Sequence, residues 1–388
     1  MSTPTKASPT PKPTDGDEGP ITSRLDQWEG ITSSAVRPAP ARLPWIAAGA
    51  GVLVGVLAWL LLSNVALGVV VGYLVYVITT YVAHRTVAGR RVGMDQLMRA
   101  LIYGAFALAL LPLISLLLTV SVNGIGRALN PDFLQQTMNG ITGLADQRYA
   151  NGDAPFIGGA YHAILGTLII TGLATIISVP IGLFAAIYLV EYGGKTKLTL
   201  ALRFFVDVMT GIPSIVAGLF AFALFAVIFG IGTKNGFAGA IALSVLMIPT
   251  VVRNSEEMLR IVPNELREAS LALGVPKWRT IFKVVLPTAA SGLASGVTLA
   301  IARVIGETAP LLVAVGGFYA LNYNPFQGPM NTLAVYAYEM FTKPLNPGVR
   351  DPSLERAWAA ALILVAIVIA LNLTARLIAK VFAPKTGR

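Results

Sequence analysis

An arginine and a glutamate stand one helical turn apart at the end of an apolar stretch, at Arg303 and Glu307. A guanidinium group offers a fixed fork of hydrogen-bond donors that suits an oxyanion, and it stays charged in a poorly solvated site. A charge in the middle of a bilayer costs about 3 kcal/mol or more, so in a membrane both groups should face protein or water. The pair predicts either a gated anion path, in which Glu307 holds Arg303 until the helices move, or a neutral pair within one helix that touches no substrate.

A glycine and a proline interrupt a second apolar stretch at Gly211-Ile212-Pro213, and a hydroxyl follows at Ser214. Inside a membrane a broken helix is tolerated only where it is buried in protein or lines a watery cavity, because its free backbone groups need partners. We therefore expect this break to line the same polar path. The residues predicted for the path are Arg303, Glu307, Thr308, Pro213 and Ser214. No residue is predicted to be catalytic.

Long runs without Asp, Glu, Lys or Arg surround these residues. They cover residues 44–83, 100–126, 154–190, 208–233, 235–252, 284–302 and 357–375. A membrane-spanning helix needs about 20 apolar residues, so the first run holds two helices and the others about one each. Only 12% of the residues are charged, against about 25% in soluble domains. We predict an all-α integral membrane protein with about eight transmembrane helices, since barrel strands would alternate over about 10 residues.

The basic residues follow membrane topology instead of forming one surface patch. With the N-terminus inside, most of the 29 lysines and arginines fall on inner segments, as the positive-inside rule requires. The outer segments hold only Arg127, Arg148, Lys234, Lys343, Arg350 and Arg356. We expect both termini in the cytoplasm, and we exclude the nucleic-acid partner that a net charge of +10 would suggest on a soluble chain. At the inner interface, Arg203 and Asp207 predict a local pair four residues apart.

One inner segment, residues 254–287, has a pattern of its own. Asn264 follows a proline and is expected to cap a short helix. Gly274 suits the left-handed position after such a helix, and Pro276 stops its continuation. Glu265 and Glu268 would give the helix an acidic first turn. Leu266, Ala269 and Leu273 would give it one apolar stripe. Such a helix can be held by another protein; the alternative is an ordinary connector between two spans.

Several residues of this segment stand at a characteristic spacing, namely Glu268-Ala269-Ser270, Gly274, Ile281 and Leu286-Pro287. They resemble the EAA loop of ABC importer permeases, with Ser270 in place of the usual second alanine. Two further stretches, 211–220 and 302–311, resemble the phosphate-specific permeases of that class, and the ending of the second is more like their A-type than their C-type subunit. The resemblance covers roughly residues 97–380.

This resemblance implies a type I ABC permease core at residues 97–382, with the cytoplasmic coupling loop at 254–287. Ahead of the core we expect a disordered cytoplasmic tail at 1–42 and an extra transmembrane hairpin at 43–84. The residues implied in coupling to an ATPase are Glu265, Glu268, Ala269, Ser270, Gly274, Leu286 and Pro287. In the phosphate permeases the Arg/Glu motif at 303 and 307 is regarded as important for transport.

The implied setting is the bacterial plasma membrane, with lipid around the helices. The implied partners are an ATP-binding subunit dimer, a second permease subunit of the C type, and an extracytoplasmic phosphate-binding protein that delivers phosphate. The alternatives are a permease for another oxyanion, such as sulfate or molybdate, and a secondary anion carrier. A carrier has no need of a cytoplasmic EAA-like helix, and no clear pair of inverted repeats is visible.

The sequence argues against several kinds of site in this chain. It contains no cysteine and only two histidines, so neither a disulfide nor a histidine-rich metal site is expected. Gly194-Lys195-Thr196 resembles the end of a phosphate-binding P-loop, but the position of the first glycine holds Leu189 and a span precedes it. We therefore expect no cofactor here: ATP and Mg would be bound by a partner subunit, and the chain is predicted to be a transporter subunit rather than an enzyme.

Overall fold

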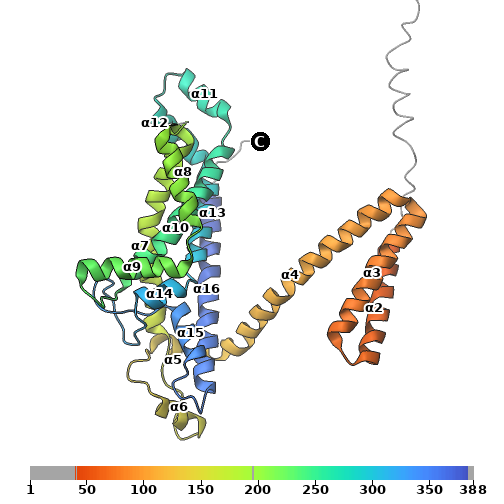
Figure 1. Ribbon diagram of the computed structural model, residues 1–388, viewed down its shortest axis with the longest axis horizontal. Coiled ribbons are helices and arrows are strands. Elements are labelled where there is room, and N and C mark those ends of the chain that lie inside the picture. The colour runs from red at the N-terminus through yellow and green to blue at the C-terminus, as the bar shows by residue number, and fades with distance from the viewer. Residues whose placement is uncertain (1–39, 41, 195, 383–388) are drawn as a thin grey trace, which may run out of the picture. The chain divides into compact units, whose positions relative to one another are not determined.

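The computed structural model describes residues 40, 42–194 and 196–382, and Figure 1 shows these residues as helices joined by loops and turns. The tail predicted at residues 1–42 lies almost wholly outside the described residues. The chain is divided into two compact units, residues 1–115 and residues 116–388.

Within the described residues, seven helices are long and apolar enough to cross a membrane. They are α2 (Leu43–Leu62), α3 (Val65–Ala88), α4 (Arg90–Ala128), α7 (Tyr161–Ile187), α10 (Gly236–Ile261), α13 (Leu286–Val304) and α16 (Asp351–Phe382). The bent pair α8 (Lys197–Thr210) and α9 (Ser214–Phe229) makes an eighth if it counts as one span. The prediction of an all-α membrane protein with about eight spans is confirmed.

Short elements connect the long helices. A π-helical turn, η1 (Tyr188–Tyr192), extends α7, while α12 (Lys277–Thr280) and a second π-helical turn, η2 (Ile281–Val285), lead without interruption into α13. The remaining helices are α5 (Pro131–Gln135), α6 (Gly143–Ala150), α11 (Asn264–Ala272), α14 (Ala309–Ala314) and α15 (Leu333–Thr342).

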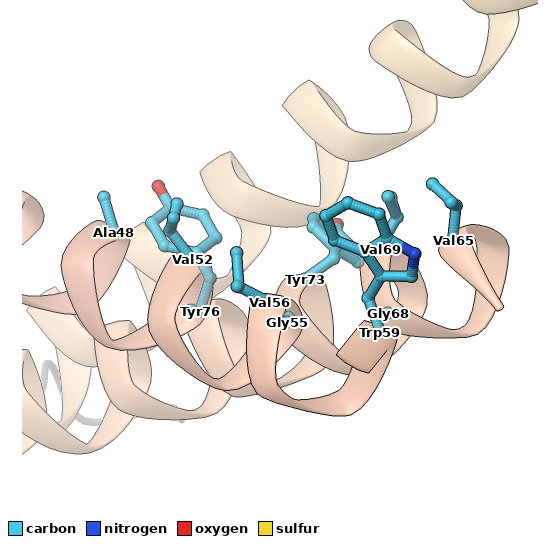
Figure 2. A pocket seen from close by; sticks show the side chains of 12 residues that line it. Ala48, Val52, Gly55, Val56, Trp59, Val65, Gly68, Val69, Tyr73 and Tyr76 are labelled. Carbon is cyan, nitrogen blue, oxygen red and sulfur yellow. The ribbon is translucent and has the colours of Figure 1, made fainter. Parts of the chain in front are cut away.

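In the first unit, α2 and α3 pack closely through glycines. A Cβ atom added to Gly55 would lie 2.9 Å from the carbonyl oxygen of Gly68, so a larger residue would force the two backbones apart. A wholly apolar groove of about 500 Å³ runs beside this contact, and Figure 2 shows Trp59, Tyr73 and Tyr76 among its lining side chains. Its lining contains no acidic, basic or histidine side chain, so nothing in it suggests chemistry.

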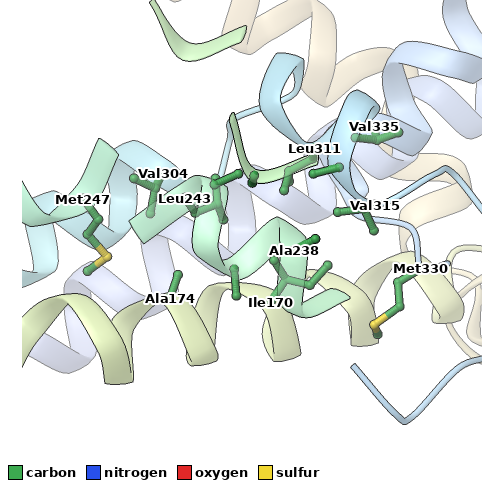
Figure 3. Close-up of a cluster of buried hydrophobic side chains, with 14 of the residues drawn as sticks. Ile170, Ala174, Ala238, Leu243, Met247, Val304, Leu311, Val315, Met330 and Val335 are labelled. Carbon is green, nitrogen blue, oxygen red and sulfur yellow. The ribbon is translucent and has the colours of Figure 1, made fainter. Parts of the chain in front are cut away.

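In the second unit, α7, α10, α13 and α16 run side by side (Figure 1). The central helix is α10, because 61% of its most apolar window is buried, more than in any other candidate span. Buried aliphatic side chains from several helices meet around it (Figure 3): Ile170, Ala174, Leu243, Met247, Val304 and Leu311. This core fixes the position of α10 and therefore of the segments attached to its two ends.

The two ends of the second unit carry different elements. One end holds α11 and α12, and the opposite end holds α5, α6 and α15 (Figure 1). At the first end α10 continues to Ile261, so the loop predicted to begin at residue 254 begins only at Val262. Within this last part of α10, Glu256 accepts from Arg260 one turn further on, at 2.6 Å, and a pair at this spacing supports the helix.

Candidate functional site

The predicted break at Gly211-Ile212-Pro213 is present. It separates α8 from α9, and the axes of the two helices differ by 106°. Pro213 occupies the cap position of α9 and is exposed, while Ser214 is the first residue of α9 and is half-buried. Because the proline ring excludes the preceding helical hydrogen bond, the chain can turn sharply here.

A second break follows Arg303. The helix α13 ends at Val304, and Glu307 and Thr308 lie in the non-helical segment before α14. The expectation that Arg303 and Glu307 form a turn of one continuous helix is therefore wrong. The physical reason is Pro310, whose ring would clash with the carbonyl group of Gly306 in a continuous helix but is well placed in the first turn of a new one.

Arg303 is exposed in the isolated chain, and its partner is a hydroxyl group. Its Nη1 donates to Oγ1 of Thr250 on α10 across 3.4 Å. Among the described residues, no ion pair joins Arg303 to Glu307 or to another carboxylate. An exposed guanidinium group on a spanning helix is too costly to face lipid. It therefore faces either a polar path or another chain.

The helices that follow the two breaks pack against each other. A Cβ atom added to Gly218 of α9 would lie 2.5 Å from Cα of Pro310 in α14. The first turns of α9 and α14 are thus in backbone contact, and this contact is possible only because residue 218 is a glycine. The structure in this way brings the segment after Ser214 beside the segment after Glu307, although they are far apart in the sequence.

The predicted coupling segment forms the helix α11, with one correction at its start. Pro263 occupies the cap position, and Asn264 is the first helical residue and caps nothing. Its Oδ1 instead accepts from Nη1 of Arg267 across 3.3 Å. The predicted end of the helix is confirmed, because α11 stops at Ala272 and Gly274 has a φ of 75°.

The apolar stripe of α11 points away from the rest of the chain. Leu266 is 43% exposed and Leu273 is 83% exposed. The acidic residues Glu265 and Glu268 are exposed as well, as is Ala269. Ser270 is the exception, because its hydroxyl group is buried and shares a 2.9 Å hydrogen bond with the hydroxyl group of Thr280. Because this chain leaves an apolar stripe on a polar loop uncovered, α11 is a candidate docking surface.

Leu286 and Pro287, the last residues of the predicted motif, begin α13. Leu286 is half-buried and packs against the cluster that surrounds Leu259 and Val285, whereas Pro287 is exposed. Within the continuous helical span Lys277–Val304 they follow directly after the π-helical turn η2. A proline has no backbone N–H group to donate, so it is best tolerated where the regular hydrogen bonds of a helix are already interrupted.

Comparison with known proteins decides the family. The sequence model of the binding-protein-dependent transport system inner membrane components matches residues 178–388. This chain belongs to that family. Every residue predicted for the path and for coupling falls within the matched range.

Two mycobacterial members of the family are similar to this chain over most of their length. The chain is 42% identical over 297 residues to the phosphate transport system permease protein PstA 1 of Mycobacterium tuberculosis (strain CDC 1551 / Oshkosh), which covers 76% of this chain and 92% of the relative. It is 41% identical over 292 residues to the phosphate transport system permease protein PstA of Mycobacterium leprae (strain TN), and this match covers 75% of this chain and 90% of the relative. The predicted resemblance to the phosphate-specific permeases is confirmed.

A solved structure agrees with the fold. The crystal structure of a bacterial ABC transporter involved in the import of the acidic polysaccharide alginate is similar with a TM-score of 0.50 and 13% sequence identity. The match covers 75% of this chain and 97% of that chain. At this identity the likeness concerns the fold alone.

Sequence reasoning missed a charge cluster at the α11 end of this family member. Glu256 is buried and pairs with Arg203 of α8 at 2.7 Å and with Arg260 at 2.6 Å. Asp207 pairs with Arg253 of α10. The predicted pair of Arg203 with Asp207 is therefore wrong, because α8 lies against α10 and both side chains reach across to it. The only signal in the sequence was the spacing of Glu256 between two arginines.

Proposed function

We propose that this chain is the A-type permease subunit of an ATP-driven importer of inorganic phosphate. The observation that carries the proposal is the 42% identity to a phosphate transport system permease protein over 92% of that relative. The two alternatives from the sequence, another oxyanion and a secondary carrier, are not favoured. All the relatives compared above bear a phosphate transport name, and the exposed α11 has no role in a carrier.

The docking surface on α11 supports an ATP-binding subunit as the first partner. Its apolar stripe ends in Leu273, and acidic side chains lie on the same helix, Glu265 in the first turn and Glu268 in the second. In this proposal α11 is the coupling helix, ATP and Mg are held by the partner dimer, and this chain makes and breaks no bonds. The basic residues in and after α11, among them Arg267, Lys277 and Arg279, support a cytoplasmic position of this end under the positive-inside rule.

Arg303 supports an anion path at the face where a second permease subunit would close the bundle. In the isolated chain Arg303 is exposed and holds only the weak contact to Thr250, so its remaining donors are free for an oxyanion. In our proposal the C-type subunit covers this face, and a phosphate-binding protein delivers its anion at the opposite end, on the loops around α5, α6 and α15.

The mechanism then follows from linkage between the two ends. ATP binding closes the partner dimer, α11 transmits that motion, and the helices open outward so that phosphate meets Arg303. Glu307, which is not paired with Arg303 in this structure, keeps the anion from being held too strongly because like charges repel. ATP hydrolysis restores the inward state and releases the anion.

Uptake of labelled phosphate tests the proposed function. Cells that lack the chain should regain uptake at low external phosphate when the chain is restored, and excess sulfate should not compete. A protonophore should have no effect while ATP is maintained. Competition by sulfate would point to a different substrate, and loss of uptake with the protonophore alone would contradict ATP-driven transport.

Two substitutions test the path in the same assay. Arg303→Lys keeps the charge but loses the fork of donors, and we expect uptake to fall at least about tenfold, which corresponds to about 1.4 kcal/mol. Glu307→Gln should change uptake less, because Glu307 holds no partner that the structure records. Unchanged uptake in both variants would remove these residues from the path.

A further inference from the structure

The π-helical turn η1 at the end of α7 is held by both arms of the coupling loop. From α11, Arg267 donates to Oε1 of Glu191 through Nε at 3.0 Å and through Nη2 at 2.9 Å. From α12, Lys277 donates to the backbone oxygen of Glu191, and its Nζ lies 4.9 Å from the ring centroid of Tyr192. Glu191 therefore accepts from one arm with its side chain and from the other with its backbone.

The same guanidinium group also holds the end of α10. Nη2 of Arg267 donates to the carbonyl oxygen of Leu259 across 2.8 Å, and Nη1 donates to that of Val262 across 2.5 Å. Leu259 lies in the last turn of α10 and Val262 is the residue that follows its end, where the helix leaves carbonyl groups without partners of its own. One side chain therefore joins three elements: the coupling helix α11, the end of α7 and the end of α10.

Little water reaches the contact between Arg267 and Glu191. The side chain of Arg267 is 15% exposed and that of Glu191 is 7% exposed. Charge-assisted hydrogen bonds in such a place are shorter and stronger than neutral ones, and removing one partner leaves the other buried and unpaired. The contact is therefore much firmer than an ion pair at the surface.

The helix α11 has few other attachments. Its apolar stripe is exposed, and its side-chain link to α12 is the single hydrogen bond between Ser270 and Thr280. A helix of this length is not stable in water by itself, so its direction is set by the contacts at its ends. A force applied to α11 must therefore reach the spans through its chain connections and through Arg267.

We propose that Arg267 is a positioning residue that fastens α11 to the end of α7 through Glu191. A movement of the coupling helix then also carries α7, in addition to α10 and α13, to which the chain itself joins α11. This inference rests on the proposed function, since it takes α11 as the helix on which an ATP-binding subunit acts. The consequence is specific: without Arg267 the partner still binds α11 and still hydrolyses ATP, but α7 does not follow.

The test is the number of phosphate ions moved per ATP hydrolysed, measured with the fully assembled transporter in liposomes. We expect Arg267→Ala to retain the ATP-binding subunit and at least half of the ATP hydrolysis, while the transport ratio falls at least about fivefold. Arg267→Lys keeps the positive charge but loses the fork of donors, so its transport ratio should lie between that of the unaltered transporter and that of Arg267→Ala. The matched control is Arg99→Ala, which breaks an exposed pair with Asp95 at 3.0 Å and should leave the ratio unchanged.

A double-substitution cycle shows whether the effect acts through Glu191. Glu191→Gln should lower the ratio, and the double variant with Arg267→Ala should be no worse than Arg267→Ala alone, because both remove one interaction. Additive losses would overturn the proposal. Loss of the ATP-binding subunit from Arg267→Ala and Arg267→Lys alike would also overturn it, since Arg267 would then act in docking. Equal falls in transport and hydrolysis, with an unchanged ratio, would assign a purely structural role.

Failure of the proposed function looks different in this experiment. If the unaltered transporter hydrolyses ATP but moves another oxyanion, the ratio is measured with that anion and the inference about Arg267 is tested as before. If the chain binds no ATP-binding subunit at all, the proposed function fails together with this inference, before any substitution is made.

Discussion

The two ends of the second unit are stabilised in different ways. At the end with α5, α6 and α15, Arg356 and Asp146 form a 2.7 Å ion pair in which both side chains are 1% exposed. Ser353 donates to Asp146 and the carbonyl oxygen of Ile157 accepts from Arg356, whereas Nε of Arg356 has no partner among the described residues. At the opposite end the polar contacts of Arg267 and Glu191 are buried, but the apolar residues of α11 are exposed. At the first end the charged groups pair within this chain, whereas at the second end a buried ion pair holds a helix whose apolar residues the chain leaves uncovered.

The largest effect should come from breaking the buried pair. Arg356→Ala leaves Asp146 buried without its charge partner, and we expect the free energy of unfolding to fall by about 3–5 kcal/mol. Denaturant titration of the protein in detergent measures this. Binding of an ATP-binding subunit to whatever protein remains folded should be unchanged, because α11 lies at the other end. A loss below about 1 kcal/mol would show that the first end is not held by this pair.

The next largest effect should be on the affinity for the ATP-binding subunit, without a change in the stability of this chain. Leu273→Glu places a charge on the exposed stripe of α11, and we expect the affinity for the ATP-binding subunit to fall at least about tenfold. The free energy of unfolding should stay within about 0.5 kcal/mol, as is usual at exposed positions. Leu144→Glu is the matched control at the opposite end, since Leu144 is 57% exposed on α6. Equal loss of binding in both variants would contradict the assignment of the docking surface.

Two glycines with the same backbone conformation sharpen the comparison further. Gly274 after α11 has a φ of 75° and Gly140 near α6 has a φ of 74°, and both have open space around a Cβ atom. Each change to alanine should cost about 1 kcal/mol, because the left-handed conformation disfavours a side chain. Only Gly274→Ala should also lower the phosphate moved per ATP, by about twofold. Equal behaviour of the two variants in transport would count against a special role for the end of α11.

The smallest effect should come from Ser270→Ala, which installs the usual alanine of the EAA pattern. It removes the hydrogen bond to Thr280, and such a bond contributes about 0.5–1.5 kcal/mol. We expect uptake to stay within about twofold of that of the unaltered chain, since Arg267 and Lys277 still hold η1. Phosphate uptake in cells measures this, with Thr280→Ser as a control that keeps the bond.

Local patterns predicted the features that depend on local chemistry. The spans follow from charge-free runs, the bend between α8 and α9 from Gly211-Ile212-Pro213, and the end of α11 from Gly274. The contacts of individual charges were not predicted in the same way. Arg203 and Asp207 both pair with α10 instead of with each other, and Glu191 meets Arg267 across 76 positions in the sequence.

The reason is that opposite charges choose partners by proximity in the folded chain. A helical spacing of three or four residues makes a pair possible, but a neighbouring helix can bring a better partner. The predicted cap at Asn264 failed for a similar reason. Pro263 takes the cap position, and the side chain of Asn264 accepts a hydrogen bond from Arg267 instead. Nearly all of the fold could be read from the sequence, together with the surface character of α11, whereas the charge network could not.

The end of α13 at Val304 also bears on the charge of Arg303. The peptide dipoles of a helix add up to about half a negative elementary charge at its C-terminus, and Arg303 lies in the last turn of α13. The backbone of α13 thus provides a partial negative charge near the guanidinium group of Arg303, and this charge stays beside Arg303 when α13 moves. If Arg303 lines the proposed anion path, this dipole would stabilise the arginine between transport cycles and would not block the next ion, because a partial charge is too weak to compete with a full anion.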